Sequence, residues 1–484
     1  MLRNVKRLTP LDGSFLRVET SNAHMHVAWC GLFAIEGDRP RPTLEQVADG
    51  IDARLAFAPR FRQRLAFPPP GMGEPYWVDD ARFHVRAHVT RLAPENQPVS
   101  HDRFMTMAGD TLSQPLLRDR PLWHLYFLPR LEDGKLGIVF KMHHALVDGK
   151  SAVELGLLLF DADPDARPMN PQEWKPSGPP GALGLTFASL RGGAEGTVAA
   201  ALRLTRLARP GHDSMAGTVR RAANSVDRDL LRLAPASFLN APLGPRRILV
   251  CHRTRIEELI RIKRMHDVTV NDVCLAAVAG ALRALALSCG EPVRPLKAMV
   301  PVSVRTDDER TALGNRISFA FVELPLELAR AEARLTRVHE QTEAFKASDR
   351  PAGFESLMGA LGYLPNALKT PAAKLVGSKR VYNLTVSNIP GPRFPVYMAG
   401  AALREAYPVV PLAEGHTLSI GMFSYRDWMF FGLYADPEAL PEVRRLPGAL
   451  ERALWELRGH RPHGVRRRRF TPKRGRVRHL AAVS

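Results

Sequence analysis

A segment rich in Pro, Asp and Gly, residues 161–182, divides the chain into two halves, and each half mixes short apolar strands with helices. Segments of this composition commonly connect folded units. Strands and helices in both halves predict an α/β or α+β fold with two lobes. We expect the 484 residues to divide into an N-terminal lobe over 1–160, a linker and crossover helix over 161–245, a C-terminal lobe over 246–457, and a disordered basic tail over 458–484.

The N-terminal half shows both of the periodicities from which strands and helices are predicted. Residues 26–36 cluster aromatic and β-branched side chains, which favours a strand. Residues 43–62 carry apolar side chains at helical spacing. The apolar runs 123–129 and 136–142 flank a Gly-containing turn and predict a hairpin. A further helix is expected over 151–160.

The C-terminal half contains further apolar segments of both kinds. The sequence predicts helices over 256–265, 271–287 and 327–347. It predicts strands over 247–253, 298–304, 317–324, 381–387, 416–423 and 428–434. The most apolar stretch, 273–289, is interrupted by Arg283, so it predicts a buried helix and not a membrane span.

The charge of the chain predicts an anionic partner. There are 68 Lys and Arg against 49 Asp and Glu, a formal charge of +19. Ten of the basic residues lie within 458–478, where no acidic residue occurs. This tail is either a solvated segment without a specific role or a segment that binds anionic lipid headgroups. No zinc-finger or helix-turn-helix motif accompanies it, so we expect no specific nucleic-acid partner.

Three features indicate a cytoplasmic protein whose contact with membranes is peripheral. The four cysteines are far apart, which favours free thiols over disulfides or a metal site. The N-terminus lacks the apolar core of a signal peptide. The basic amphipathic segment 195–209 is either a helix that packs between the halves or one that lies on a membrane.

The string Lys141-Met-His-His-Ala-Leu-Val-Asp-Gly149 follows directly from the apolar run 136–142. Adjacent residues of an extended chain point to opposite sides, so one of His143 and His144 is expected to face a cavity while the other packs below it. A turn at the end of the strand can bring Asp148 back toward the imidazole, and Gly149 permits a close backbone approach. One alternative is that the histidines merely end a core strand. The other is a metal site, which the spacing of the histidines and the aspartate does not favour.

The residue types in this string suit general-base catalysis. A neutral imidazole can remove the proton of a hydroxyl as its oxygen attacks a thioester carbonyl, and can then return that proton to the leaving thiolate. Histidine fits this task because its unperturbed pKa is about 6.5. The chain has no Gly-x-Ser-x-Gly segment, so the pattern favours direct transfer without a serine nucleophile.

His-His-x-x-x-Asp-Gly resembles the signature of the CoA-dependent acyltransferase superfamily. Further segments resemble the bacterial wax ester synthase/diacylglycerol acyltransferase family within it, and their order along the chain is more specific than any single motif. These segments are LTPLDGSFLRVETSNAHMHV at 8–27, RPLW at 120–123, NDV at 271–273, VPVSVR at 300–305, GNRIS at 314–318 and NLTVSNIPGP at 383–392. The resemblance implies a two-lobed fold similar to chloramphenicol acetyltransferase, with a channel between the lobes.

The resemblance also implies catalytic roles for the residues that match the motif. His144 would be the general base on the acceptor hydroxyl, and His143 would support the fold and orient that ring. Asp148 would be structural, in an ion pair with a distant arginine, and Gly149 would lie close to the substrate. Arg305 is the candidate partner of Asp148, with an ordinary surface arginine as the alternative.

Four further residues are candidates for substrate binding, each with a structural alternative. Asn271 either caps the helix that it begins or donates a hydrogen bond near the reacting carbonyl. Ser387 and Asn388 either face the channel or form the turn before Pro390. Trp123 either shapes the wall of the acyl pocket or packs in the core.

The function that the resemblance implies is O-acyl transfer. A long-chain acyl group would pass from acyl-CoA to diacylglycerol or to a fatty alcohol, with no metal and with acyl-CoA as co-substrate in place of a cofactor. The enzyme would lie at the inner face of the membrane or on lipid inclusions. One alternative is another hydroxyl or amine acceptor. The other is a non-catalytic lipid-surface protein, against which the intact His144, Asp148 and Gly149 argue.

Overall fold

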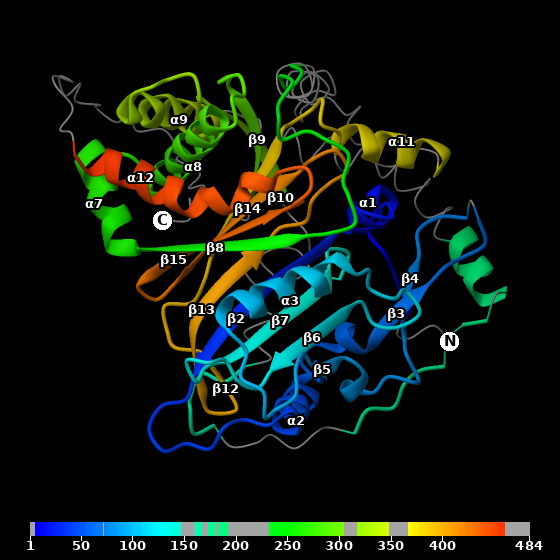
Figure 1. Ribbon diagram of the computed structural model, residues 1–484. Coiled ribbons are helices and arrows are strands. Elements are labelled where there is room, and N and C mark those ends of the chain that lie inside the picture. The colour runs from blue at the N-terminus through cyan, green and yellow to red at the C-terminus, as the bar shows by residue number, and fades with distance from the viewer. Residues whose placement is uncertain are drawn as a thin grey trace, which may run out of the picture.

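Two sheets, each of six described strands, form the centre of the molecule and lie in separate lobes (Figure 1). This arrangement confirms the mixed, two-lobed fold that the sequence predicts. The computed structural model describes residues 5–70, 72–146, 160–166, 173–178, 180–181, 183–191, 232–303, 317–347 and 366–459.

The first sheet belongs mainly to the N-terminal half. Its strands lie in the order β12 (Tyr397–Met398), β13 (Ala401–Val409), β2 (His26–Ala34), β7 (Leu136–His143), β6 (Trp123–Leu128) and β5 (Val89–Arg91). The predicted hairpin is confirmed, since β6 and β7 pair antiparallel with Trp123 opposite Met142. Every residue of β7 is buried, which explains why its sequence is apolar apart from Lys141 and His143.

The second sheet contains all six strands that the sequence predicts for the C-terminal half. Their spatial order is β10 (Ile317–Leu324), β9 (Leu296–Ser303), β11 (Leu384–Pro390), β14 (Leu418–Tyr425), β15 (Trp428–Ala435) and β8 (Ile248–Arg255). Strand β11 runs parallel to both of its neighbours, and the other pairs are antiparallel. A small third sheet has the order β1 (Lys6–Arg7), β4 (Tyr76–Asp79) and β3 (Gln63–Ala66).

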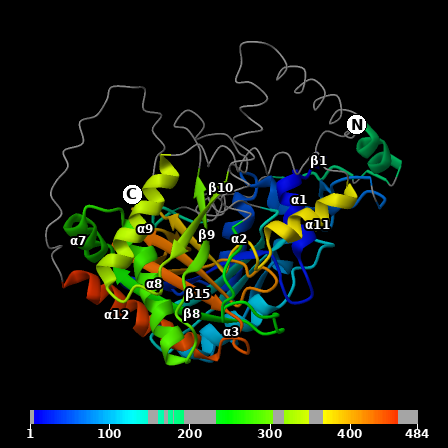
Figure 2. The same cartoon turned by 90° about the horizontal axis from the view of Figure 1, so that it is seen from above.

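Helices surround these sheets. They are α1 (Pro10–Val18), α2 (Leu44–Arg54), α3 (His101–Ser113), α7 (Ile256–His266), α8 (Val270–Ser288), α9 (Ala331–Lys346), α11 (Asn366–Val376) and α12 (Leu446–Arg458). Short 3₁₀ turns lie at Pro59–Arg62, Val85–Ala87 and Pro441–Arg445. Helices α7, α8, α9 and α12 gather on the second lobe, whereas α1 and α11 lie together at the opposite side of the molecule (Figure 1, Figure 2).

Two strands of the C-terminal half, β12 and β13, belong to the sheet of the first lobe. Strand β13 pairs antiparallel with β2, and Tyr407 lies opposite Cys30. It also packs against β14 and β15 of the second sheet. Residues 397–409 of the C-terminal half thus complete the first sheet.

Helix α2 is shorter than the sequence predicts. The apolar spacing suggested a helix over 43–62, but α2 ends at Arg54 and a separate 3₁₀ turn begins at Pro59. Proline lacks a backbone N–H and disfavours the helical conformation of the residue before it, so the helix cannot continue through Pro59.

Among the described residues, α8 is the helix with the length and hydropathy of a membrane span. It is instead the central helix of the second lobe, where Val273, Leu275 and Val278 are completely buried. The prediction of a buried helix is confirmed. The predicted helices over 151–160 and 195–209 fall outside the described residues except for Phe160, as does the basic tail beyond residue 459.

Candidate active site

His143 is the last residue of β7, and His144 begins the turn that follows. Backbone hydrogen bonds hold both residues in place. The His143 N–H donates to the Leu122 carbonyl oxygen (2.9 Å), and the His144 N–H donates to the Met25 carbonyl oxygen (2.8 Å). The two imidazoles are therefore presented by a backbone that is fixed to β6 on one side and to the start of β2 on the other.

The His143 side chain is buried beneath the site. Its Nδ1 accepts a hydrogen bond from the backbone N–H of Ala145 (2.9 Å). Since this nitrogen acts as an acceptor, the hydrogen-bond pattern assigns the proton to Nε2, which lies 3.1 Å from the Glu19 carboxylate. The His143 ring is thus held between the Ala145 backbone at Nδ1 and the Glu19 carboxylate beside Nε2.

Glu19 is the residue that holds His143, and it follows directly after α1. Its carboxylate also accepts hydrogen bonds from the Met25 backbone N–H (2.9 Å) and from the Arg118 guanidinium. Burial by itself raises the pKa of Glu19, but the hydrogen bonds from His143, Arg118 and Met25 outweigh it and lower the pKa to about 2. Glu19 therefore remains ionised at any physiological pH.

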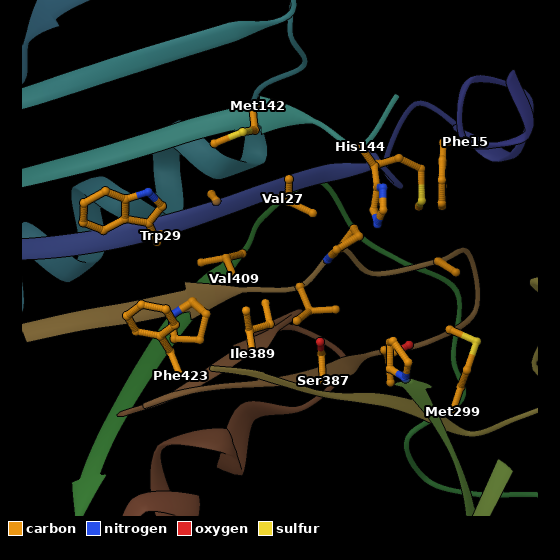
Figure 3. A pocket seen from close by; sticks show the side chains of 18 of the residues that line it. Phe15, Val27, Trp29, Met142, His144, Met299, Ser387, Ile389, Val409 and Phe423 are labelled. Carbon is orange, nitrogen blue, oxygen red and sulfur yellow. The ribbon is translucent and has the colours of Figure 1, made fainter. Parts of the chain in front are cut away.

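The His144 ring points the other way, into a cavity between the two lobes (Figure 3). It stacks on the ring of Phe15 from α1, with the ring centroids 3.9 Å apart and the planes inclined by 16°. The two histidines therefore point to opposite sides, as the extended strand predicts. Stacking fixes the plane of the His144 imidazole while its edge faces the cavity.

The cavity has a volume of about 260 Å³ and an apolar wall. From the first lobe, Val27, Trp29 and Met142 line it, and from the second lobe Met299, Ile389 and Phe423 do so (Figure 3). Among the described residues, the lining side chains with polar functional groups are His144, Ser14, Trp29, Tyr382, Thr385 and Ser387. Such a cavity suits an apolar chain whose reactive end lies beside His144.

Of the two neighbours Ser387 and Asn388, Ser387 faces the cavity. Both Ser387 and Asn388 lie within β11, opposite Gly421 and Met422 of β14, and so do not form a turn. Ser387 lines the cavity and lies across it from His144 (Figure 3). Successive residues of a strand alternate in direction, and the Asn388 amide accordingly donates to the Asn271 side-chain oxygen (3.2 Å).

Asn271 does not cap α8. The cap is Thr269, which together with Asp272 forms a reciprocal capping box at the start of the helix. Asn271 is the second residue of the helix, and its side chain contacts Asn388. The predicted capping role of Asn271 is therefore wrong. Its hydrogen bond to Asn388 places it next to β11, the strand that carries Ser387.

Trp123 lies away from the cavity that His144 faces. Its indole N–H donates to the Phe61 carbonyl oxygen (2.8 Å), and its ring packs against Phe61, His88 and Phe140. Only 1% of the residue is exposed. The structure therefore shows Trp123 as part of the core of the first lobe, the alternative that the sequence left open.

Three of the predicted site residues, Asp148, Gly149 and Arg305, lie outside the described residues. Conversely, sequence reasoning assigned no role to Glu19 and Phe15, which contact the two histidines. Both belong to the segment 8–27, whose resemblance to the family is the sequence signal that contains them. Within the described part of the chain, no three His, Cys, Asp or Glu side chains are placed to bind one metal ion.

Models of known families match both halves of the chain. The wax ester synthase/diacylglycerol acyltransferase catalytic domain matches residues 8–274, and the WS/DGAT C-terminal domain matches residues 313–458. The chain is 31% identical over 477 residues to a probable diacylglycerol O-acyltransferase of Mycobacterium tuberculosis. The aligned region covers 97% of this chain and 99% of the relative. A second such protein of the same organism is 28% identical over 461 residues, or 93% of this chain and 98% of the relative.

Solved structures with the same fold include a wax ester synthase/diacylglycerol acyltransferase from Marinobacter aquaeolei VT8. It is 26% identical, has a TM-score of 0.65, and covers 93% of this chain and 98% of its own. A trichothecene 15-O-acetyltransferase from Fusarium sporotrichioides is 13% identical, with a TM-score of 0.61 and coverage of 94% and 95%. The second likeness concerns the fold alone.

Proposed function

The chain belongs to the bacterial wax ester synthase/diacylglycerol acyltransferase family, and we propose that it passes a long-chain acyl group from acyl-CoA to diacylglycerol or to a fatty alcohol, with His144 as the general base. Membership makes the protein an acyl-CoA-dependent O-acyltransferase. The observation that carries the proposed mechanism is the position of His144, whose ring borders an apolar cavity between the lobes.

In the proposed reaction, His144 removes the proton of the acceptor hydroxyl as the oxygen attacks the thioester carbonyl. The tetrahedral intermediate collapses with loss of the CoA thiolate, which takes the proton from the imidazolium. The products are an ester and free CoA, and His144 returns to its neutral form. No covalent acyl-enzyme is formed, and no group other than the two substrates is consumed.

The surroundings of His144 support this role. Phe15 holds the plane of the His144 ring by stacking. Glu19 anchors His143, the residue that precedes His144. A ring that keeps its orientation needs no reordering when the hydroxyl arrives. Ser387, across the cavity, is the candidate hydrogen-bond donor to the carbonyl oxygen in the transition state. Asp148, paired with Arg305, is proposed to stabilise the turn after His144, and Gly149 is proposed to lie close to the substrate.

The apolar wall supports a long-chain acyl group as the transferred moiety. Transfer of methylene groups from water into an apolar environment is favourable by about 0.8 kcal/mol for each group. Since Trp29 and Phe423 lie at the end of the cavity away from His144, an acyl chain whose thioester reaches His144 would run toward these rings (Figure 3).

We further propose that the enzyme works in the cytoplasm at the inner face of the membrane or on lipid inclusions. Both candidate acceptors are lipids, and the formal charge of +19 favours anionic surfaces as well as the phosphates of CoA.

The test is CoA release from palmitoyl-CoA by the purified protein in detergent, with a diacylglycerol and hexadecanol supplied separately. We expect release that depends on an acceptor, and the acceptor that supports the faster release identifies the preferred alcohol. Absence of release with both acceptors would contradict the proposal and favour a different acceptor or a non-catalytic protein.

A further inference from the structure

Helix α11 has two apolar sides, and one of them faces solvent. Leu368, Pro371 and Leu375 are spaced by three and four residues, which places them in one row along the helix. Leu368 is 53% exposed and Leu375 is 63% exposed. A soluble helix normally buries its apolar row, so this exposed row requires a separate explanation.

The other side of α11 belongs to the active-site cavity. Ala373 and Val376 line that cavity, and the helix packs against α1, which carries Phe15. Figure 2 shows α1 and α11 together at one edge of the molecule. The exposed row therefore lies on the outer surface of an element whose inner surface is part of the cavity wall.

The charged residues in and directly after α11 are all basic. Residues 366–380 contain four basic residues and no acidic residue. Lys369 is buried, where its Nζ lies 3.1 Å from the Glu74 carboxylate. Lys374, Lys379 and Arg380 are exposed. An apolar row flanked by exposed cations matches a surface of acyl chains beneath anionic headgroups.

A second helix also carries an exposed apolar row. In the helix over 183–191, Leu183, Phe187 and Leu190 are each more than half exposed, with spacings of four and three residues. The inner side of this helix packs through Leu185 on Tyr76 of β4.

The two helices share a support. Glu74, which holds Lys369 of α11, lies two residues before Tyr76, on which the helix over 183–191 packs. The inner sides of both helices are therefore anchored at the start of β4, within residues 74–76.

We propose that α11 and the helix over 183–191 form a lipid-docking face that seats the enzyme on an anionic membrane surface, with their exposed apolar rows in the acyl region. The acceptor lipid would then enter the cavity past α11 without crossing water. This inference rests on the proposed function in one respect only, namely that the acceptor is a lipid.

The experiment compares vesicle binding by the full-length wild type and the double variant Leu368→Gln/Leu375→Gln. Vesicles are phosphatidylcholine, with or without phosphatidylglycerol, and binding is measured by flotation. The basic tail is the same in both proteins, so any difference belongs to α11. The matched control is Leu287→Gln, which changes a leucine that is 57% exposed in the last turn of α8, on the other lobe.

We expect the double variant to bind vesicles about tenfold or more weakly, because two leucines no longer leave water. Leu287→Gln should change binding less than about twofold. The charge variant Lys374→Glu/Lys379→Glu should lose binding to vesicles that contain phosphatidylglycerol and keep its binding to phosphatidylcholine alone. Unchanged binding of the leucine variant, or an equal loss in the control, would overturn the docking face and leave a protein partner as the explanation of the exposed rows.

Activity assays separate this inference from the proposed function. With acceptor dispersed in detergent, the leucine variant should release CoA at the rate of the wild type, whereas with acceptor in vesicles its rate should fall with its binding. If the wild type releases no CoA in detergent, the proposed function fails, while the flotation result still decides the docking face.

Discussion

At the residue scale, two adjacent histidines perform different tasks because the strand turns them to opposite sides. Both nitrogens of His143 are engaged, by Ala145 and by Glu19, so this ring is not available to a substrate. His144 borders the cavity and is held by stacking on Phe15. The contrast could be predicted from the strand pattern, but Glu19 and Phe15 could not be assigned, since only the fold brings α1 against the end of β7.

Glu19 is expected to act on catalysis through His143. Glu19→Ala removes the acceptor of the Nε2 proton and should lower kcat about tenfold, with little change in KM for acyl-CoA. Glu19→Gln keeps a side-chain oxygen acceptor and should recover most of the rate. Steady-state kinetics of the two variants check this. Equal losses in both, or a loss confined to KM, would contradict a positioning role.

The low pKa of Glu19 also predicts a pH dependence of stability. Its folded pKa of about 2 lies below the ordinary glutamate value of 4.5, so the ionised side chain contributes about 3 kcal/mol of stability above pH 4.5. This contribution is lost as the pH falls from 4.5 toward 2. Urea unfolding of wild type and Glu19→Gln should therefore differ most at pH 7, and the difference should shrink below pH 4.5 and disappear only as the pH approaches 2. A difference that is constant over this range would exclude the ionised form as its source.

At the element scale, β13 joins the two lobes and lines the cavity between them. The backbone of Pro408 in β13 contacts the backbone of Gly432 in β15. A Cβ added at Gly432 would lie 1.8 Å from the Pro408 carbonyl oxygen. The sequence did not predict β13, because Arg404, Glu405 and Pro408 interrupt its apolar pattern. In the fold, Glu405 is buried and lies 3.3 Å from Lys135 and 3.2 Å from Arg253. Partners distant in sequence thus make this strand possible.

Gly432→Ala should therefore be strongly destabilising. The added methyl group meets backbone, which cannot rotate away, so β13 and β15 must separate, and we expect a loss of several kcal/mol or insoluble protein. Gly448→Ala in α12 is the control, since the nearest atom is the mobile end of Arg452 at 3.6 Å, and alanine favours helix. Thermal unfolding checks both variants. A melting temperature of Gly432→Ala within about 2 °C of wild type would contradict this packing.

At the scale of the whole molecule, the two lobes are not independent units. Residues 397–409 complete the sheet of the first lobe, and the Arg247 backbone N–H of the second lobe donates to Ser113 of α3 (2.9 Å). The sequence predicted the two lobes and their mixed class from local patterns. Local patterns did not predict the crossing strand, since it depends on contacts between residues hundreds of positions apart. The channel between the lobes followed only from the family resemblance.

A fragment of residues 1–245 should consequently fail to fold on its own. Without β13 the edge of β2 would expose unpaired N–H and C=O groups beside apolar residues, a surface that invites aggregation. Co-expression with residues 246–484 should restore soluble protein. Size-exclusion chromatography of both preparations checks this. A soluble monomeric fragment with native secondary structure would show that the first lobe does not need β13.

The most direct test of the central claim is acceptor-dependent CoA release by His144→Ala. We expect turnover at least about 10²-fold below wild type with an unchanged melting temperature, because a general base is lost while the backbone bonds of residue 144 remain. His101→Ala, at an exposed position at the start of α3, should keep the wild-type rate. Turnover near the wild-type rate in folded His144→Ala would contradict the assignment of His144 as the base.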